Sequence, residues 1–281
     1  MAYEGKFVDL HVHTNYSDSS FTPEEVIAEA RASRLDVVAI TDHDTLLGIG
    51  PARRAGEPGE GAAVEVVAGV ELTSYRDDVE HHVVGLLVDE SSTELLERLE
   101  AFRLARHRRI FAIARKLEEL GVRIDPEAVF ELAGEGTVGR AHVAEVLIRD
   151  GHARDIPTVY GAYIGTGAPA NVPKPCFSAA ESVDLIHKAG GVAVLAHPGE
   201  EVDTEKIEYF ASVGIDGIEA YCPSYGGSLR RRYLQLADYY GLVPAGGSDD
   251  HGRLKERILL GTVQLPGEIL DRLVERAQRW R

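Results

Sequence analysis

A regular alternation of short apolar runs with helical patterns is the feature that most constrains the fold of this 281-residue chain. The runs are rich in β-branched residues and bounded by turn residues, which is typical of buried strands. Strand–helix alternation predicts an α/β fold, with a barrel built mainly from parallel strands as the leading architecture. The strand-type runs span residues 7–12, 37–41, 64–72, 82–88, 191–197, 214–221, 242–248 and 258–265.

Capping residues mark where helices begin between these runs. Thr22-Pro23-Glu24-Glu25 puts proline in the first turn and acids near the positive end of the helix dipole, so it predicts a helix over 22–33. Ser178 begins a similar helix that closes at Gly190. Two more helices are predicted over 204–213 and 227–240.

The middle of the chain interrupts this alternation. Residues 91–167 contain three charged helical patterns and no strand-type run, and 165–175 (GTGAPANVPKP) is rich in Gly and Pro. We therefore predict one barrel domain formed by 1–90 and 168–281, with 91–167 inserted as a small helical subdomain that caps the substrate.

Histidines and acids follow the predicted strands at the point where each strand ends. Such strand ends share one face of a parallel barrel, where active sites are built. His11 and His13 lie two positions apart and so point to the same side of a strand. His81-His82 instead opens its run, which fits an antiparallel or short strand with one of the two facing inward. The other strand-end residues are Asp42, His43, Asp44, Glu71, His197, Asp249, Asp250 and His251.

Each of these residues also has an ordinary structural explanation, such as a hydrogen-bonded histidine or an aspartate that caps a helix. That explanation must hold independently at five or six strand ends, which makes it improbable for the whole set. Imidazoles and carboxylates without thiolates favour Zn, Mn or Fe. Six histidines with their neighbouring carboxylates exceed the need of one ion, so the sequence predicts two or three divalent metal ions.

The motifs HVHTNYSD, AITDHD, GVELT, LAHPG and GSDDHG, in this order, resemble the polymerase and histidinol phosphatase (PHP) family of metal-dependent phosphoesterases. The resemblance covers essentially the whole chain and implies a distorted (β/α)7-type barrel. The segments GRAHVAEVLI and NVPKPCFSAAESVDLIHKAGGVAVLAHPG are similar to a bacterial branch of nucleotide phosphatases and exoribonucleases. That branch implies removal of the 3′-phosphate from nucleoside 3′,5′-bisphosphates, 5′-3′ trimming of short RNA, or both.

The resemblance also implies a ligand set. His11, His13, Glu71 and Asp249 would hold one ion, and Glu71 would bridge to a second ion held by His82 and His197. A third ion would be held by the remaining three, Asp18, His43 and His251. His82 is preferred to His81 because the family ligand directly precedes the apolar run.

The remaining site predictions concern substrate and support. Arg140 in the VGRAH motif can fork onto a phosphate, with His142 and Lys174 as secondary candidates. Asp44 and Asp250 stand beside ligands and are predicted to orient a histidine from behind. Asn171 stands where the branch often carries an aromatic residue, which leaves base stacking there in doubt.

The nucleophile is predicted to be a metal-bridging hydroxide. Cys176 and Cys222 lie outside the ligand runs and no Gly-x-Ser-x-Gly elbow is present. A net charge of −16 argues against a broad nucleic-acid-binding surface but not against a small anionic substrate such as a nucleotide or short oligonucleotide. Without a signal-peptide pattern or a long apolar run, we expect a cytoplasmic protein that does not bind membranes. The oligomeric state is not indicated.

Three alternatives stay open from the residues. Another phosphomonoesterase of the family, acting for example on histidinol phosphate, would share the ligand set. An amidohydrolase-type hydrolase also begins with H-x-H but usually supplies a lysine or similar bridging group from its fourth strand. A non-catalytic metal-binding scaffold would have lost ligands, and none of the nine is missing.

Overall fold

The computed structural model describes residues 2–59, 61–77, 79–174, 176–254 and 257–281. The chain divides into two compact units, the first formed by 1–97 and 177–281 and the second by 98–176. The division falls within a long helix, α3 (Thr93–Glu119). The predicted insertion, 91–167, overlaps the second unit.

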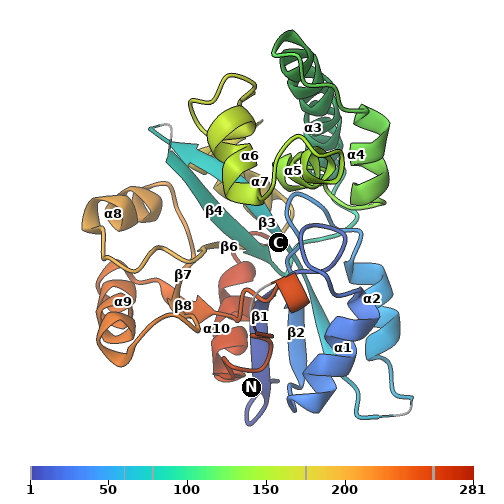
Figure 1. The fold of residues 1–281 in the computed structure, drawn as a ribbon. Helices are drawn as coiled ribbons and strands as arrows, with labels where there is room; N and C mark the ends of the chain where they lie inside the picture. Colours follow the sequence, from blue (N-terminus) through green and yellow to red (C-terminus); the bar gives the residue numbers. More distant parts are fainter. Residues whose placement is uncertain (1, 60, 78, 175, 255–256) are drawn as a thin grey trace. The chain divides into compact units, whose positions relative to one another are not determined.

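The first unit is built on one mixed sheet (Figure 1). Its main path runs β8-β7-β6-β4-β3-β2-β1-β9, and β5 pairs with β3. The strands are β1 (Phe7–Val12), β2 (Val37–Ile40), β3 (Glu65–Arg76), β4 (Val79–Leu86), β5 (Phe177–Ser178), β6 (Val192–Leu195), β7 (Gly217–Tyr221), β8 (Val243–Gly246) and β9 (Leu265–Pro266).

The sheet curls into a nearly closed barrel. After β1 and β8, the His13 amide donates to the Asp250 carbonyl at 3.2 Å and the Asp249 amide donates to the His11 carbonyl at 2.9 Å. Most neighbouring strands along the path are parallel, but β4 is antiparallel to both β3 and β6. The start of β4 therefore lies at the same end of the barrel as the ends of β3 and β6. The α/β barrel expected from the sequence is confirmed.

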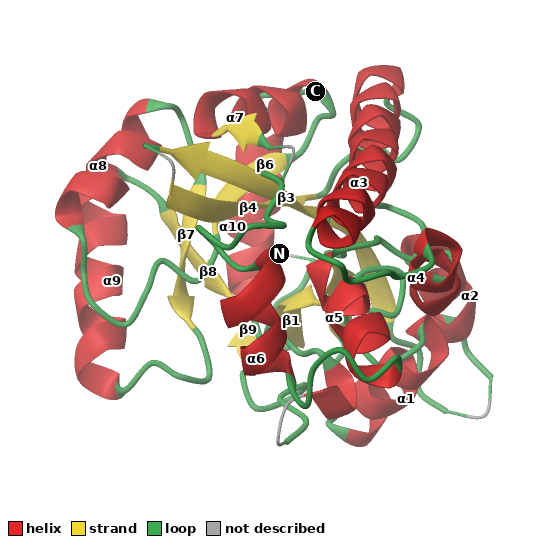
Figure 2. Ribbon diagram, turned by 45° about the horizontal axis from the view of Figure 1, so that its top comes forward, coloured by secondary structure: helices red, strands yellow, loops and turns green. Residues whose placement is uncertain are grey.

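Helices flank this sheet, and α8 and α9 lie beside each other (Figure 2). An apolar core of strand residues such as Val8, Val84 and Val194 is continuous with Leu270 and Leu273 of the last helix. Burial of such side chains from water is the main force that holds the barrel closed. The helices of this unit are α1 (Pro23–Ala32), α2 (Ile49–Gly56), α7 (Ala179–Lys188), α8 (Thr204–Ser212), α9 (Gly227–Tyr240) and α10 (Glu268–Ala277), with a short 3₁₀ turn at Gly252–Leu254.

The predicted helix starts are confirmed. Thr22 caps α1, accepting from the Glu25 amide at 3.3 Å, and the Glu25 carboxylate accepts from the Thr22 amide at 3.0 Å. Ser178 and Glu181 form the same reciprocal pair at α7. Helices α2 and α10 were not predicted from the sequence.

One strand prediction is wrong. Of the run 258–265, only its last residue belongs to a strand, β9. The Asp250 carboxylate accepts from the Leu259 and Leu260 amides, at 2.6 and 3.2 Å. Gly261 then adopts a positive φ of 80°. Apolar composition was misleading here, because a buried loop held by a carboxylate uses apolar residues as readily as a strand does.

The second unit is helical. The part of α3 beyond residue 97 packs with α4 (Pro126–Ala133), α5 (Arg140–Arg149), α6 (Ile156–Val159) and a π-helical turn at Tyr160–Ile164 around a separate apolar core. Arg109 Nε and Lys116 Nζ on α3 donate to the carbonyls of Val172 and Asn171, each at 2.8 Å. These two bonds hold the returning segment against α3. Among the described residues, no helix is long and apolar enough to cross a membrane.

Candidate metal centre

Nine polar side chains converge at one end of the barrel in the first unit. They come from the strand ends and following loops, except that Glu71 lies in the middle of β3 and His82 comes from near the start of β4. The reversed direction of β4 explains why a residue near its start meets residues from the ends of its neighbours. The nine are the ligand set expected from the sequence: His11, His13, Asp18, His43, Glu71, His82, His197, Asp249 and His251.

Glu71 lies at the centre of this cluster and is fully buried. Its Oε2 atom is 3.3 Å from His11 Nε2, 3.2 Å from His13 Nε2 and 3.2 Å from His43 Nδ1. Its Oε1 atom is 3.0 Å from His82 Nδ1 and 3.1 Å from His197 Nε2. One carboxylate thus faces two separate sets of imidazoles, one with each oxygen.

The side chains around Glu71 form three groups, defined here by their members. In the first group, Asp249 Oδ1 lies 3.6 Å from His11 Nε2 and 3.3 Å from His13 Nε2. The second group is His82 and His197 on Glu71 Oε1. In the third group, Asp18 lies 3.4 Å from His251 Nε2 and 3.6 Å from His43 Nε2. Three sets of these residues have ligand atoms within 4.8 Å of one another, close enough to share a cation. They are His13, Asp18, His43 and His251; His11, His13 and Asp249; and His43, Glu71 and His82.

The donor set fits divalent cations. It contains imidazole nitrogens and carboxylate oxygens but no thiolate, a mixture suited to Zn, Mn or Fe. Glu71 Oε2 is buried and makes no hydrogen bond, although three imidazoles surround it. A buried carboxylate oxygen without a donor is costly. A cation at this point would satisfy that oxygen and the imidazole lone pairs together.

Charge coupling shifts the pKa values throughout the cluster. Burial opposes the charged form of His13, but the adjacent Asp249 and Glu71 carboxylates raise its pKa to about 10. The pKa of His11 is also raised well above its usual value against burial, by Glu219 and Glu71. The pKa of Asp18 and that of Asp249 are lowered by neighbouring histidines despite burial. Burial lowers the pKa of His43 to about 3, so this imidazole is neutral.

Glu219 on β7 is a supporting residue that the sequence analysis missed. Its Oε1 atom is 2.7 Å from His11 Nδ1, and its Oε2 atom accepts from the His197 amide. One carboxylate therefore orients a histidine of the first group and the backbone of a histidine of the second. The available signal was an acid near the end of the apolar run GIDGIEAY, where a buried charge needs a partner.

We expect Glu219→Gln to weaken metal binding by about 10- to 100-fold, the usual effect of removing a carboxylate behind a metal-binding histidine. The amide keeps the shape but loses the charge that fixes the His11 ring. Titration with Mn²⁺ measures the change, and Glu208→Gln on the exposed side of α8 is the matched control. Equal affinity in the two variants would contradict the role given to Glu219.

The two aspartates predicted to orient histidines contact backbone amides. Asp44 Oδ1 accepts from the Thr73 amide at 3.2 Å. Asp250 accepts from Gly252 as well as from Leu259 and Leu260, so it shapes the loop that carries His251. The carboxylate that contacts the His11 ring belongs to Glu219 instead.

The predicted substrate residues lie in the second unit. Arg140 is the first residue of α5, donates to the Ile164 carbonyl at 3.3 Å and lies over the Tyr160 ring at 5.5 Å. His142 Nδ1 accepts from the Gly139 amide at 3.1 Å. Lys174 is half-buried in the returning segment.

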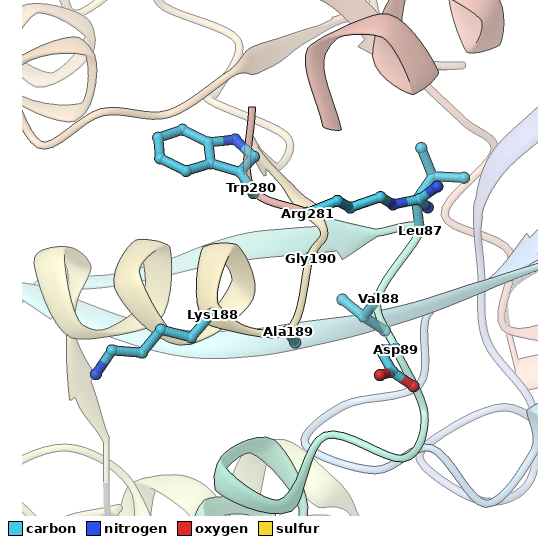
Figure 3. Close-up of a pocket in the computed structure, with 8 residues that line it drawn as sticks. All are labelled: Leu87, Val88, Asp89, Lys188, Ala189, Gly190, Trp280 and Arg281. Carbon is cyan, nitrogen blue, oxygen red and sulfur yellow. The ribbon is translucent and has the colours of Figure 1, made fainter. Parts of the chain in front are cut away.

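A cavity of about 450 Å³ lies elsewhere in the first unit (Figure 3). It is lined by Leu87–Asp89, which follow the end of β4, and by Lys188–Gly190, Trp280 and Arg281. Because β4 begins at the histidine cluster, this cavity is at the opposite end of the barrel. Lys188 points away from Asp89 in Figure 3 and is paired with Glu94 and Asp184.

Comparison with known proteins agrees with this architecture. The family model of the PHP domain matches residues 9–119. The 5′-3′ exoribonuclease Rnm of Escherichia coli is 34% identical over 248 residues, covering 86% of this chain and 84% of that protein. This chain belongs to the PHP family. The family expected from the sequence motifs is thereby confirmed.

Other PHP relatives carry related names. The 3′,5′-nucleoside bisphosphate phosphatase of Chromobacterium violaceum is 31% identical, with 87% of each chain covered. The phosphoribosyl 1,2-cyclic phosphate 1,2-diphosphodiesterase of Eggerthella lenta is 32% identical, covering 87% of this chain and 94% of that one. A crystal structure from Bifidobacterium adolescentis, of a predicted metal-dependent phosphoesterase, superposes with a TM-score of 0.82 at 28% identity and covers 96% of each chain. The PHP chain described here is an enzyme of the hydrolase class, as the sequence predicted.

Proposed function

We propose that this protein is a metal-dependent phosphatase that removes the 3′-phosphate of nucleoside 3′,5′-bisphosphates and trims short RNA in the 5′-3′ direction. The observation that carries the proposal is the cluster of nine side chains around Glu71, in which each carboxylate oxygen faces its own set of imidazoles. The names of the relatives from Escherichia coli and Chromobacterium violaceum support the nucleotide substrate.

In this proposal the cluster holds two or three divalent ions, of Mn, Fe or Zn. His11, His13 and Asp249 would hold the first ion, His82 and His197 would hold the second, and Glu71 would serve both through its two oxygens. Asp18, His43 and His251 hold the third. Such ions lower the pKa of a bound water towards 7 and neutralise phosphoryl oxygens. The side chains fix the positions at which this chemistry takes place, and Glu219 fixes the His11 ring.

No side chain at the cluster is suited to act as the nucleophile. Cys222 follows β7, but burial raises the pKa of its thiol, which disfavours the reactive thiolate. Cys176 belongs to the second unit. Direct attack by water on phosphorus, without a covalent enzyme intermediate, is therefore the proposed route.

The second unit is proposed to supply phosphate binding. Residues 98–176 contain twelve Lys and Arg against ten Asp and Glu, so they carry +2 of the total charge of −16 and leave −18 on the first unit. A guanidinium has five N–H donors, and the bond from Arg140 to Ile164 uses one. Arg140 is proposed as the phosphate clamp, and His142 and Lys174 are proposed as secondary phosphate-binding residues.

A substrate panel tests the proposal. With Mn²⁺, the protein should release phosphate from 3′-phosphoadenosine 5′-phosphate and give AMP. Arg140→Met should raise KM about tenfold or more, since a charge-assisted phosphate contact contributes roughly 1.5–3 kcal/mol. Its metal content should not change. Arg149→Met, an exposed arginine at the other end of α5, is the matched control.

The same substrate panel also tests the alternative activities. Turnover of histidinol phosphate with intact bisphosphonucleotides would contradict the nucleotide assignment. Selective cleavage of a ribosyl 1,2-cyclic phosphate would favour the activity named for the Eggerthella lenta relative. Failure to hydrolyse any phosphate ester with bound metal would favour a scaffold.

A further inference from the structure

The backbone that carries His197 is held in an unusual conformation. His197 has a φ of 24° and Gly199 a φ of 122°. Positive φ is unfavourable for a histidine, whereas glycine adopts it readily. A strained ligand backbone persists only when surrounding contacts determine it.

Two buried tyrosines grip the peptide groups of Gly199. The Gly199 amide donates to the Tyr225 hydroxyl at 3.1 Å, and the Tyr233 hydroxyl donates to the Gly199 carbonyl at 2.8 Å. Their rings stack with centroids 5.2 Å apart and an interplanar angle of 25°. Tyr233 is completely buried and Tyr225 is 5% exposed. Both hydroxyls are thus used to bind the backbone two residues beyond His197.

Two further contacts fix the neighbouring residues. Lys206 on α8 donates its ammonium to the Pro198 carbonyl. Glu219 accepts from the His197 amide. The three residues 197–199 are consequently held through their backbones by β7, the β7–α9 loop, α8 and α9. In this backbone conformation, His197 Nε2 lies 3.1 Å from Glu71 Oε1 and 3.3 Å from His82 Nδ1.

We propose that Tyr225 and Tyr233 are positioning residues that hold the 197–199 backbone so that the His197 imidazole is presented to the second metal ion. Neither tyrosine contacts the cluster, and neither is part of the ligand set. The proposal rests on the proposed function, because it takes His197 as a ligand. It adds that affinity for one ion of the cluster is set by hydroxyl groups outside the ligand set.

The test is a titration with Mn²⁺ in which the electron paramagnetic resonance signal measures the concentration of free Mn²⁺. This titration gives the stoichiometry and the affinity of each class of site without an activity assay. Tyr225→Phe and Tyr233→Phe retain the rings and remove only the hydroxyls. We expect each to weaken one class of Mn²⁺ site by about 10- to 100-fold and to leave the other sites unchanged. Tyr239→Phe on the same helix α9, where the side chain is 77% exposed, is the matched control.

Two more variants separate the possible failures. His197→Ala should abolish the same class of site. If it binds Mn²⁺ as the wild type does, the ligand assignment of the proposed function is wrong. If His197→Ala loses that site while both Phe variants bind normally, the tyrosine inference alone is overturned.

Lys206→Met helps to distinguish a loss of positioning at residues 197–199 from a general loss of stability. It leaves both tyrosines intact and removes the contact with Pro198, so we expect a selective weakening of the same site. Uniform weakening of every Mn²⁺ site in the Phe variants, with a lowered Tm, would overturn the positioning role. Selective weakening at an unchanged Tm supports it.

Discussion

Glu71→Gln is expected to lower kcat/KM by at least about 10³-fold, because the proposed metal ions would supply several kcal/mol of transition-state stabilisation and each 1.36 kcal/mol is tenfold in rate. The amide keeps the size of the side chain. It removes the charge that faces His11, His13 and His43 through one oxygen and His82 and His197 through the other. No other described residue contacts both sets in this way.

Metal analysis should show the same defect directly. We expect Glu71→Gln to retain at least one ion fewer than the wild type after dialysis. Glu65→Gln is the matched control, because Glu65 lies on the same strand but is exposed and pairs with Lys6. A Glu71→Gln protein with full metal content and activity would contradict the bridging role.

Metal affinity should rise steeply with pH. The adjacent Asp249 and Glu71 carboxylates raise the pKa of His13 to about 10 against the effect of burial, and the pKa of His11 is raised as well. Without metal, this pair therefore retains one or two of its protons near neutral pH, and a cation must displace them. Each displaced proton contributes tenfold per pH unit, so the affinity should grow by about 10²- to 10⁴-fold from pH 6 to pH 8.

The sign is set by which groups are already deprotonated. The pKa values of Asp18, Asp249 and Glu71 are lowered by their histidine neighbours, so these carboxylates release no protons in this range. Burial lowers the pKa of His43 to about 3, so it too is ready to bind. Only the histidines with raised pKa values resist the cation, and raising the pH removes that resistance.

Calorimetric titration with Mn²⁺ in buffers of different ionisation enthalpy measures the protons released. We expect one to two per cluster at pH 7. His187→Gln is the control, since His187 pairs with Asp216 outside the cluster and should leave the slope unchanged. An affinity independent of pH would show that His11 and His13 are neutral before metal binds.

Much of the candidate site could be predicted because most of its histidines and acids come at or just after the ends of predicted strands. His11 and His13 share a face through the two-residue period of a strand, and their partners follow other apolar runs. The barrel brings such ends together whatever the details of each loop. The pair His81-His82 was expected to open an antiparallel or short strand, and the resemblance to the PHP family selected His82 from the pair.

The supporting contacts were not predictable in the same way. Glu219 occupies the middle of a strand, and only the structure shows that it faces His11 and His197. Asp250 binds the amides of Leu259 and Leu260, which converts an apolar run into a loop. Tertiary contacts of this kind override local propensity, and no spacing in the sequence specifies them.

The closing seam of the barrel gives the metal centre a second role. The backbone bonds that join His13 to Asp250 and His11 to Asp249 involve three residues of the first group itself. Closing the sheet and assembling those ligands are therefore one event, between segments from opposite ends of the chain. Linkage requires that a cation which binds the closed seam also strengthens it by the same factor. A cation bound at this seam would therefore stabilise the folded barrel as well as take part in the reaction.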